Sequence, residues 1–274
     1  MKRAKCTIVI FSLALASCRG PAASPGVSPQ VAQVRIMATT ATDPLLQDFV
    51  MAYHPPGILF AVTRETASWQ TVYAQVGAGE VPFGLTTYLP AEAGWWAAPI
   101  GQDGLAVIVH PSSPITALSI EQLRRLFQGQ IISWAELGGP DVPVVLVSQE
   151  KGADSWLAFD SLVMGGRRTS LGARLALSGQ SMVEMVSSEP GAVGYVSMAY
   201  LTPQVRAVAV ASEGEAIPLT RETVNRKTYP LQTPILVIGR VPPAEDDPYH
   251  DWFAWMQSAA GQAVLERRYA GPQS

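Results

Sequence analysis

Cysteine is almost absent from this sequence: its 274 residues include only Cys6 and Cys18, both close to the N-terminus. The rest of the chain has no thiol that could form a disulfide, bind a metal or act as a nucleophile. Charged residues are also scarce, at 15% of the chain, and the formal net charge is −3 at pH 7. Because contacts to a phosphate backbone need clustered Lys and Arg, this charge argues against nucleic acid as a partner.

Recognisable catalytic patterns are missing as well. The three histidines, His54, His110 and His250, are scattered and show no His-Glu-x-x-His spacing. The sequence also lacks a Gly-x-Ser-x-Gly elbow, a Gly-x-Gly-x-x-Gly turn and a P-loop. We therefore expect no catalytic residue, no metal site and no cofactor, and a chain that is not an enzyme.

The first 18 residues have the features of an export signal. A basic start precedes an apolar run over residues 7–17, which is too short to remain as a membrane-spanning helix. The run ends in Leu15-Ala16-Ser17-Cys18, which resembles the lipobox, where a cysteine is acylated and the chain is cut just before it. We expect residues 1–17 to be a lipoprotein signal peptide and Cys18 to carry palmitate-type lipid. An ordinary secretory peptide is the alternative.

The predicted location follows from this N-terminus. More than one acyl chain on Cys18 would anchor the protein stably at the cell membrane, facing the periplasm or the cell exterior. Residues 18–33 are rich in Pro, Gly, Ala and Ser without an apolar period, and we expect them to be a flexible tether. A body of about 240 residues remains, which is enough for one large domain or two.

The first part of the body alternates between strand and helix patterns. Residues 34–38 form a β-type run, and after the polar turn 39–44 apolar residues recur at helical spacing. A second strand covers 57–63, residues 64–68 open the next helix, and a third strand and turn cover 81–87. Such alternation implies parallel strands whose carboxyl ends share one edge, where α/β sheets bind ligands.

The later part of the body continues this pattern. Ser119-Ile-Glu-Gln122 and Ser133-Trp-Ala-Glu136 have the spacing of capping boxes. The residues that follow Gly152-Ala153-Asp154-Ser155 have an amphipathic helical pattern, so we expect the N-terminus of that helix to point to a ligand. The further predicted strands cover residues 103–110, 142–147, 192–197, 205–210 and 234–238.

Three motifs stand in order along the chain: DGLAVIVHP at residues 103–111, LSIEQLRRLFQG at 118–129 and ISWAELGG at 132–139, with two weaker stretches at 191–197 and 260–266. Together they resemble motifs of the phosphate-binding proteins of ATP-driven (ABC) importers. The likeness runs from about residue 34 to the C-terminus.

This resemblance implies a fold and a function. The fold would be an α/β, two-lobed periplasmic-binding-protein-like fold of type II, in which each lobe is a mostly parallel sheet flanked by helices and crossing strands form the hinge. Lobe 1 would comprise residues 34–110 and 230–272, and lobe 2 residues 111–229. The protein would bind phosphate or a related small oxyanion in the cleft between the lobes. It would act as a monomer and hand this solute to an ABC permease.

The resemblance also implies which residues contact the solute. In this family helix N-termini and hydroxyl groups hold the oxyanion, which fits the exposed N–H groups and positive dipole end of a helix. These donors come from four corners between a strand and the next helix. The expected ligand-binding residues are Thr39, Thr40, Ala41, Ser68, Thr86, Ala153, Asp154 and Ser155.

At four positions the sequence departs from the family's pattern. Pro82 stands where the family has an Asp that accepts a proton from phosphate, and Gln149 where it has an Arg. Ala153 and Asp154 stand where it has a Ser and a Gly. Asp154 either takes over the acceptor role or is an ordinary N-cap. Lys151 and Arg64 are candidates for the missing positive charge. The alternative functions are binding of a non-phosphate solute, and a sensor or interaction protein that has kept the fold.

Overall fold

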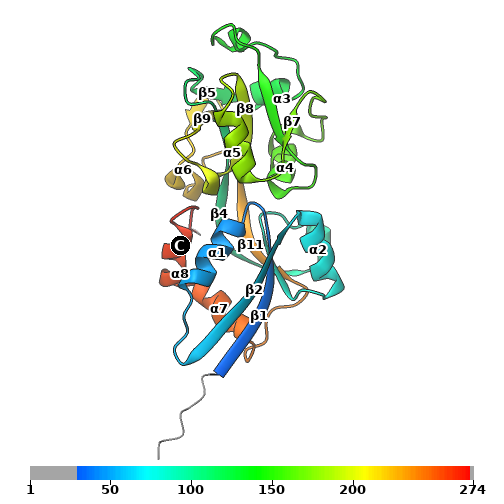
Figure 1. The fold of residues 1–274 in the computed structure, drawn as a ribbon, viewed down its shortest axis with the longest axis vertical. Coiled ribbons are helices and arrows are strands. Elements are labelled where there is room, and N and C mark those ends of the chain that lie inside the picture. The colour runs from blue at the N-terminus through cyan, green and yellow to red at the C-terminus, as the bar shows by residue number, and fades with distance from the viewer. Residues whose placement is uncertain (1–29, 272–274) are drawn as a thin grey trace, which may run out of the picture.

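The computed structural model describes residues 30–271, so the predicted signal peptide and Cys18 lie outside the described residues. The elements gather into two lobes stacked along the longest axis of the molecule (Figure 1). The chain enters the upper lobe along β4 (Trp96–Val109) and returns to the lower one along β11 (Gln232–Gly239). In the described part, no helix is both long and apolar enough to cross a membrane.

The lower lobe, lobe 1, contains both ends of the described chain (Figure 1). Helices cover its sheet on both sides. Besides β11 and the first part of β4, its elements are β1 (Gln30–Thr39), α1 (Asp43–Ala52), β2 (Ile58–Ala67), α2 (Trp69–Ala78), β3 (Phe83–Thr86), the short 3-10 helix η1 (Ala91–Ala93), α7 (Pro248–Gln257) and α8 (Ala259–Leu265).

The upper lobe, lobe 2, is built from the middle of the chain. Its strands are β5 (Ala117–Ser119), β6 (Val145–Gln149), β7 (Arg174–Ala176), β8 (Ala192–Ser197), β9 (Arg206–Ser212) and β10 (Glu215–Ile217). Its helices are α3 (Ile120–Phe127), η2 (Trp134–Leu137), α4 (Asp154–Phe159), the π-helical η3 (Asp160–Met164), α5 (Gly179–Ser187), η4 (Met198–Tyr200) and α6 (Arg221–Asn225).

One path of hydrogen-bonded strands runs through both lobes in the order β2-β1-β3-β11-β4-β8-β6-β7. β1 pairs in parallel with β2 and β3, so the carboxyl ends of these three strands all point toward lobe 2 (Figure 1). In lobe 2, β6 is parallel to both β7 and β8. The predicted two-lobed α/β fold is therefore confirmed, and its strand ends and helix starts face the gap between the lobes.

β4 changes partners where it crosses between the lobes. Its residues 96–104 pair with β11, and residues 105–109 pair with β8 and β9 of lobe 2. We therefore propose that the boundary between the lobes lies within β4, near Gly104, rather than after residue 110 as the sequence suggested.

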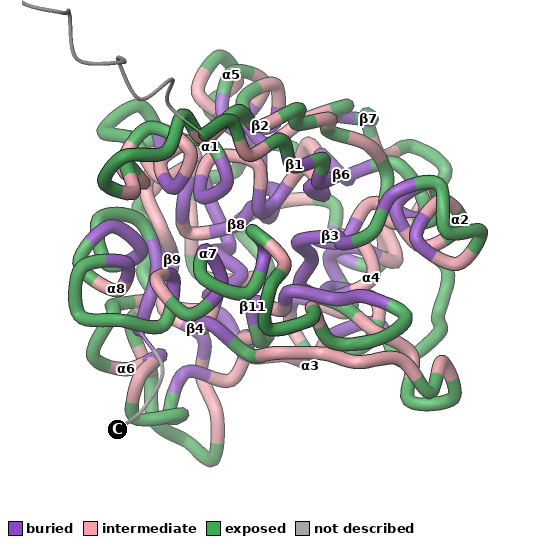
Figure 2. The backbone as a smooth tube through the Cα atoms, turned by 90° about the horizontal axis from the view of Figure 1, so that it is seen from below, coloured by how far each residue is buried: buried purple, intermediate pink, exposed green. Residues whose placement is uncertain are grey.

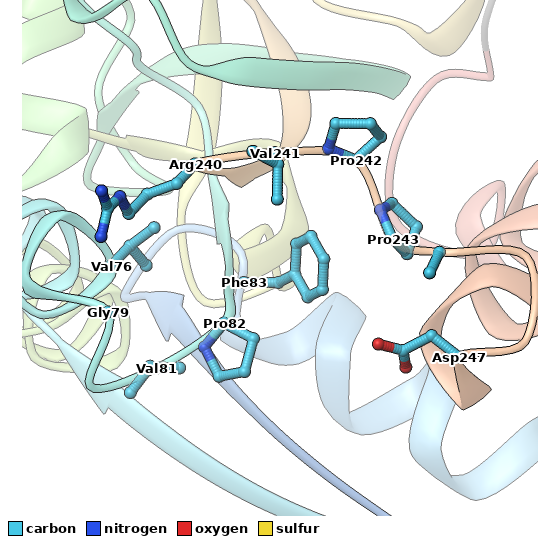
Figure 3. A pocket seen from close by; sticks show the side chains of 11 residues that line it. Val76, Gly79, Val81, Pro82, Phe83, Arg240, Val241, Pro242, Pro243 and Asp247 are labelled. Carbon is cyan, nitrogen blue, oxygen red and sulfur yellow. The ribbon is translucent and has the colours of Figure 1, made fainter.

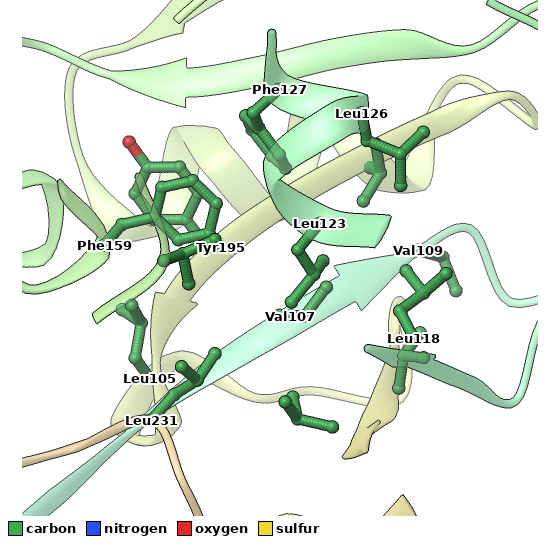
Figure 4. Close-up of a cluster of buried hydrophobic side chains, with 14 of the residues drawn as sticks. Leu105, Val107, Val109, Leu118, Leu123, Leu126, Phe127, Phe159, Tyr195 and Leu231 are labelled. Atoms are coloured by element: carbon green, nitrogen blue, oxygen red, sulfur yellow. The ribbon is translucent and has the colours of Figure 1, made fainter. Parts of the chain in front are cut away.

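Each lobe has its own hydrophobic core. In lobe 2, Leu123 of α3 lies next to Val107 of β4, and Phe127 of the same helix contacts Phe159, which stacks on Tyr195 with ring centroids 4.0 Å apart (Figure 4). In lobe 1, α1, α7 and α8 cover one face of the sheet, and α7 buries Trp252 completely. Figure 2 shows buried residues in the interior and exposed ones along the outer loops. Each fully buried large side chain contributes about 1.5–3 kcal/mol to stability.

The local patterns of the sequence are largely reproduced, with two corrections. Residues 30–33, expected to belong to the flexible tether, are the start of β1 and pair with β2. Both predicted capping boxes form, although the one at Ser133 opens the short η2 rather than an α-helix. Residues 64–67, expected to open a helix, instead continue β2. Arg64 and Thr66 both bind the Asp43 carboxylate, at 2.8 and 2.5 Å, which holds this segment extended. The helix starts at Ser68, whose hydroxyl accepts from the third residue along as an N-cap.

Candidate functional site

The corner between β1 and α1 presents hydrogen-bond donors to lobe 2. Thr39 is the last residue of β1, and Thr42 is the N-cap of α1. The Thr42 side chain caps nothing in its own helix, because its hydroxyl donates to the Leu85 carbonyl of β3 at 2.7 Å. The hydroxyls of Thr39 and Thr40 and the amide of Ala41 bind a group from outside lobe 1, although the Thr39 hydroxyl also lies 3.0 Å from the Thr42 hydroxyl.

The group that they bind is the carboxylate of Asp154 in lobe 2. Its Oδ2 accepts from the Thr39 hydroxyl in a short hydrogen bond and from the Ala41 amide at 3.3 Å. Its Oδ1 accepts from the Thr40 hydroxyl at 3.2 Å and from the Ser155 amide at 3.1 Å. Four donors from two lobes therefore converge on one carboxylate, which is fully buried.

Asp154 is the first residue of α4 rather than its N-cap. The N-cap is Ala153, which offers no side-chain acceptor. The Asp154 carboxylate binds the amide of the next residue and also the start of α1 in the other lobe. The interpretation of Asp154 as an ordinary N-cap is therefore wrong, because its main partners lie across the gap between the lobes.

The electrostatic setting of this carboxylate is acidic. Burial raises the pKa of Asp154 above its usual value, and its four hydrogen bonds offset part of the rise. A second carboxyl, Asp103 of β4, is also buried, and burial together with the charge of Asp154 raises its pKa to about 8. Within residues 30–271, none of the buried polar residues is a Lys or an Arg. The site thus holds two acids without a buried cation.

Two tyrosines fix the carbonyls of the same corner. The Tyr200 hydroxyl donates to the Thr40 carbonyl, and the Tyr269 hydroxyl donates to the Ala41 carbonyl, each at 2.6 Å. Tyr200 belongs to η4 of lobe 2, whereas Tyr269 follows α8 in lobe 1. The corner is therefore held from both lobes, with its N–H and O–H groups directed to Asp154.

The start of α2 approaches the site through Gln70. Gly152 has a φ of +93°, and a Cβ added there would come within 1.8–2.2 Å of the Gln70 side chain. Glycine suits this position for two reasons: the backbone is left-handed, and a side chain would collide with Gln70 of the other lobe.

The predicted site residues are only partly brought together. Thr39, Thr40, Ala41, Asp154 and Ser155 form the cluster, and Ala153 stands beside it as the N-cap of α4. The remaining two of the eight residues bind their own turns.

Ser68 and Thr86 are these two residues. Ser68 is exposed, and its hydroxyl hydrogen-bonds within the first turn of α2. Thr86 is buried, and its hydroxyl bonds both backbone groups of Tyr88.

A cavity of about 220 Å³ lies between the lobes next to α4. Thr87, Leu157 and Thr233 are among the residues that line it, so both lobes and β11 contribute to its walls. Its lining is mainly apolar, with few polar atoms facing inward.

The two candidate cations are engaged elsewhere. Lys151 lies over the ring of Trp156, with its Nζ 5.9 Å from the ring centroid. Arg64 forms a salt bridge with Asp43 at 2.8 Å. Within residues 30–271, neither side chain forms a hydrogen bond or a salt bridge with Asp154.

The family of this chain follows from its match to the model of one protein family. The model of the PBP superfamily domain matches residues 23–260, which is most of the chain. The chain belongs to the PBP superfamily. This match, together with the similar proteins described next, confirms the resemblance that the motifs suggested.

Curated relatives of this PBP-superfamily chain include proteins named phosphate-binding protein PstS. It is similar to the phosphate-binding protein PstS of Borreliella burgdorferi, with 23% identity over 174 residues, covering 61% of this chain and 62% of the relative. It is also similar to PstS of Bacillus subtilis, with 28% identity over 128 residues, covering 47% and 41%. The matches thus span less than two thirds of the length of these relatives.

Solved structures agree on the fold. An ABC-type phosphate transport receptor from Vibrio cholerae superimposes with a TM-score of 0.72 at 23% identity, covering 87% of this chain and all of the other.

One of the departures from the family pattern needs correction. Pro82 precedes β3 and lines a pocket of about 450 Å³ on the side of lobe 1 away from the cleft, together with Phe83 and Pro242 (Figure 3). Asp154 lies beyond the opposite, carboxyl end of the β1–β3 strands. A solute contact from β3 would therefore have to come from Thr86 or Thr87, and Pro82 cannot be the place of a lost acceptor.

Sequence reasoning missed three residues of the site in this PBP-superfamily chain. Asp103 stood at the start of an apolar strand, where a carboxyl is unusual and could have signalled a buried acid. Tyr200 and Tyr269 gave no signal, because they reach the Thr40 and Ala41 carbonyls from 160 and 228 positions away.

Proposed function

We propose that this protein is an extracytoplasmic, lipid-anchored solute-binding protein that closes its lobes around phosphate or a related small oxyanion and delivers it to an ABC permease. The observation that carries the proposal is the convergence of donors on one point. Thr39, Thr40 and Ala41 from lobe 1 and the Ser155 amide from lobe 2 surround a buried negative group. A set of donors that can hold a carboxylate has the hydrogen-bonding character that an oxyanion requires.

The physical basis is the pair of helix N-termini. α1 and α4 begin at this point, so their free amides and dipoles favour negative charge between them. Since one helix belongs to each lobe, an anion held by both would link the lobes, and hinge motion at β4 and β11 would open and close the site.

The relatives support the same function. The curated proteins that the chain resembles are named phosphate-binding proteins, and the Vibrio cholerae structure is named a phosphate transport receptor. The proposed function is binding and delivery by a monomer, with no chemical step, no cofactor and no nucleic acid. The lipobox-like Leu15-Ala16-Ser17-Cys18 supports the membrane anchor.

The proposal is tested by the melting temperature of the protein with phosphate, sulfate, molybdate and tungstate, against chloride at equal ionic strength. A ligand at 100 times its Kd stabilises the folded state by about 2.7 kcal/mol. For a body of this size that corresponds to a shift of about 5–10 °C. If no oxyanion raises the melting temperature of the wild type or of a variant without the Asp154 carboxylate, the anion-binding function is wrong.

A second candidate function is favoured by the Asp154 carboxylate itself. Because a side chain already fills the anion position, the protein could remain closed without solute and serve as a sensor or interaction protein. A wild type that binds no oxyanion in a broad screen, yet binds a defined membrane receptor in its closed form, would favour this function over transport.

A further inference from the structure

The anion position between the lobes has an occupant that belongs to the chain. Both oxygens of the Asp154 carboxylate are saturated, each with one hydroxyl donor and one amide donor. The side chain is completely buried. A free oxyanion that sought the same hydroxyls and amides would have to take the place of this carboxylate.

No buried positive charge would allow both anions to stay. The buried polar residues in the described part of the chain include Asp103 and Asp154 but no Lys or Arg. The two cationic candidates from the sequence, Lys151 and Arg64, are held by Trp156 and Asp43. Like charges in a desolvated site repel strongly, so occupation by Asp154 and by a free anion is mutually exclusive.

Asp154 also links the two lobes. Three of its four donors belong to the β1–α1 corner of lobe 1, while the residue itself begins α4 of lobe 2. The contact between Gly152 and Gln70 and the hydrogen bond from Tyr200 to Thr40 join the lobes at the same place. Side chains and backbone groups of the protein itself therefore join the two lobes across the cleft.

We propose that Asp154 is a tethered anion, which closes the cleft in the absence of solute and competes with a free oxyanion for the same donors. This inference rests on the proposed function for the identity of the site and adds its regulation. Solute binding then requires the Asp154 side chain to leave, so the residue sets both the affinity for oxyanions and the resting state of the cleft.

The competition is tested by calorimetric titration of inorganic phosphate into the full-length protein. Asp154→Ala removes the carboxylate, and Asp154→Gly also removes its Cβ. We expect both variants to bind phosphate at least tenfold more tightly than the wild type. Asp160→Ala, which removes a half-buried carboxylate at the end of α4 away from these donors, should bind as the wild type does. Equal affinity in the wild type and both Asp154 variants overturns the competition.

The resting closure is tested without any solute. Small-angle X-ray scattering should give a larger radius of gyration for Asp154→Ala than for the wild type, and the amide of Ala41 should exchange its hydrogen faster. Asp160→Ala should match the wild type in both measurements. An Asp154→Ala protein that is as compact as the wild type, with a protected Ala41 amide, overturns the proposal.

The two experiments separate this inference from the proposed function. If every protein binds phosphate equally well, oxyanion binding stands and the tethered anion is wrong. If no protein binds phosphate or sulfate while Asp154→Ala still opens the cleft, the transport function fails and closure by Asp154 stands.

Discussion

The hydroxyl of Thr39 donates to the carboxylate of Asp154, a residue 115 positions further along the chain and in the other lobe. Thr39 ends β1 and Asp154 begins α4, so this one hydrogen bond joins the two corners that face each other across the cleft. Both residues are fully buried. Their contact makes the closed arrangement depend on individual polar atoms as well as on packing.

Thr39→Val should weaken this link. Valine fills nearly the same volume but leaves one carboxylate oxygen of Asp154 with a single donor, the Ala41 amide. Because hydrogen bonds to charged groups contribute about 1.5–3 kcal/mol, we expect the free energy of unfolding to fall by that amount. Thr39→Ser, which keeps the hydroxyl, should lose less than half as much. Urea unfolding of the three proteins measures the effect, and equal losses in both variants would show that the methyl group contributes as much as the hydroxyl and that this hydrogen bond has no special weight.

Asp103 should make the protein less stable as the pH rises. Burial, with a contribution from the charge of Asp154, raises the pKa of Asp103 from 3.8 to about 8. Between these values the unfolded chain has lost the proton while the folded protein keeps it. The free energy of unfolding should therefore decrease from about pH 4 to pH 8, by up to about 1.4 kcal/mol per pH unit from this group, and level off above.

Asp103→Asn isolates this contribution. The amide oxygen can still accept from the Met198 amide, which lies 3.2 Å from the Asp103 carboxylate, but the side chain no longer titrates. The variant should gain stability relative to the wild type as the pH rises from about 5 to 8. Urea unfolding across this range gives the two profiles, and parallel profiles would mean that Asp103 keeps an ordinary pKa.

Gly152 and Gln70 form a contact that can be tested as a pair. Gly152→Ala should destabilise the closed form by about 1–3 kcal/mol, because a Cβ there meets the Gln70 amide and the backbone has φ +93°. Gln70→Ala should recover the part of this loss that is due to the clash. A double-mutant cycle in thermal unfolding measures the coupling. Additive effects of the two substitutions would show that the backbone strain accounts for the whole loss.

The sequence predicts the elements of this fold better than their contacts. Periodicity and capping boxes identify most strands and helix starts, such as Ser119 for α3, because these depend on neighbouring residues. The strand over residues 64–67 escaped prediction because it depends on pairing with residues 36–39 of β1, supported by the bonds from Arg64 and Thr66 to Asp43. Neighbouring residues therefore predict most elements, whereas contacts between distant residues set some of the boundaries of these elements.

The site shows the same division. The donors at Thr39 and Thr40 could be predicted, since hydroxyl residues between a strand and a helix occupy positions that bind ligands. The role of Asp154 could not, because its partners come from the other lobe and are set by closure. A carboxylate at a helix start has many local uses, and only the three-dimensional arrangement distinguishes them.

The two tyrosine hydroxyls should differ in effect although their hydrogen bonds are alike. Tyr200→Phe removes a bond between the lobes, whereas Tyr269→Phe removes one within lobe 1. Each should lower the free energy of unfolding by about 1 kcal/mol. Only Tyr200→Phe should also increase the radius of gyration without solute. If both or neither open the cleft, the hydroxyl of Tyr200 is not a link between the lobes.

Cys18 should determine where the protein resides. The chain has only one other cysteine, Cys6, which lies within the predicted signal peptide. Cells that express the protein and are fed labelled palmitate should incorporate label into the wild type and into Cys6→Ala, because both proteins retain the Cys18 thiol. Cys18→Ala should carry no label and should leave the membrane fraction, since stable anchoring needs the acyl chains on this residue. Label or membrane attachment that persists in Cys18→Ala would contradict the lipid anchor and leave an ordinary secretory peptide as the function of residues 1–17.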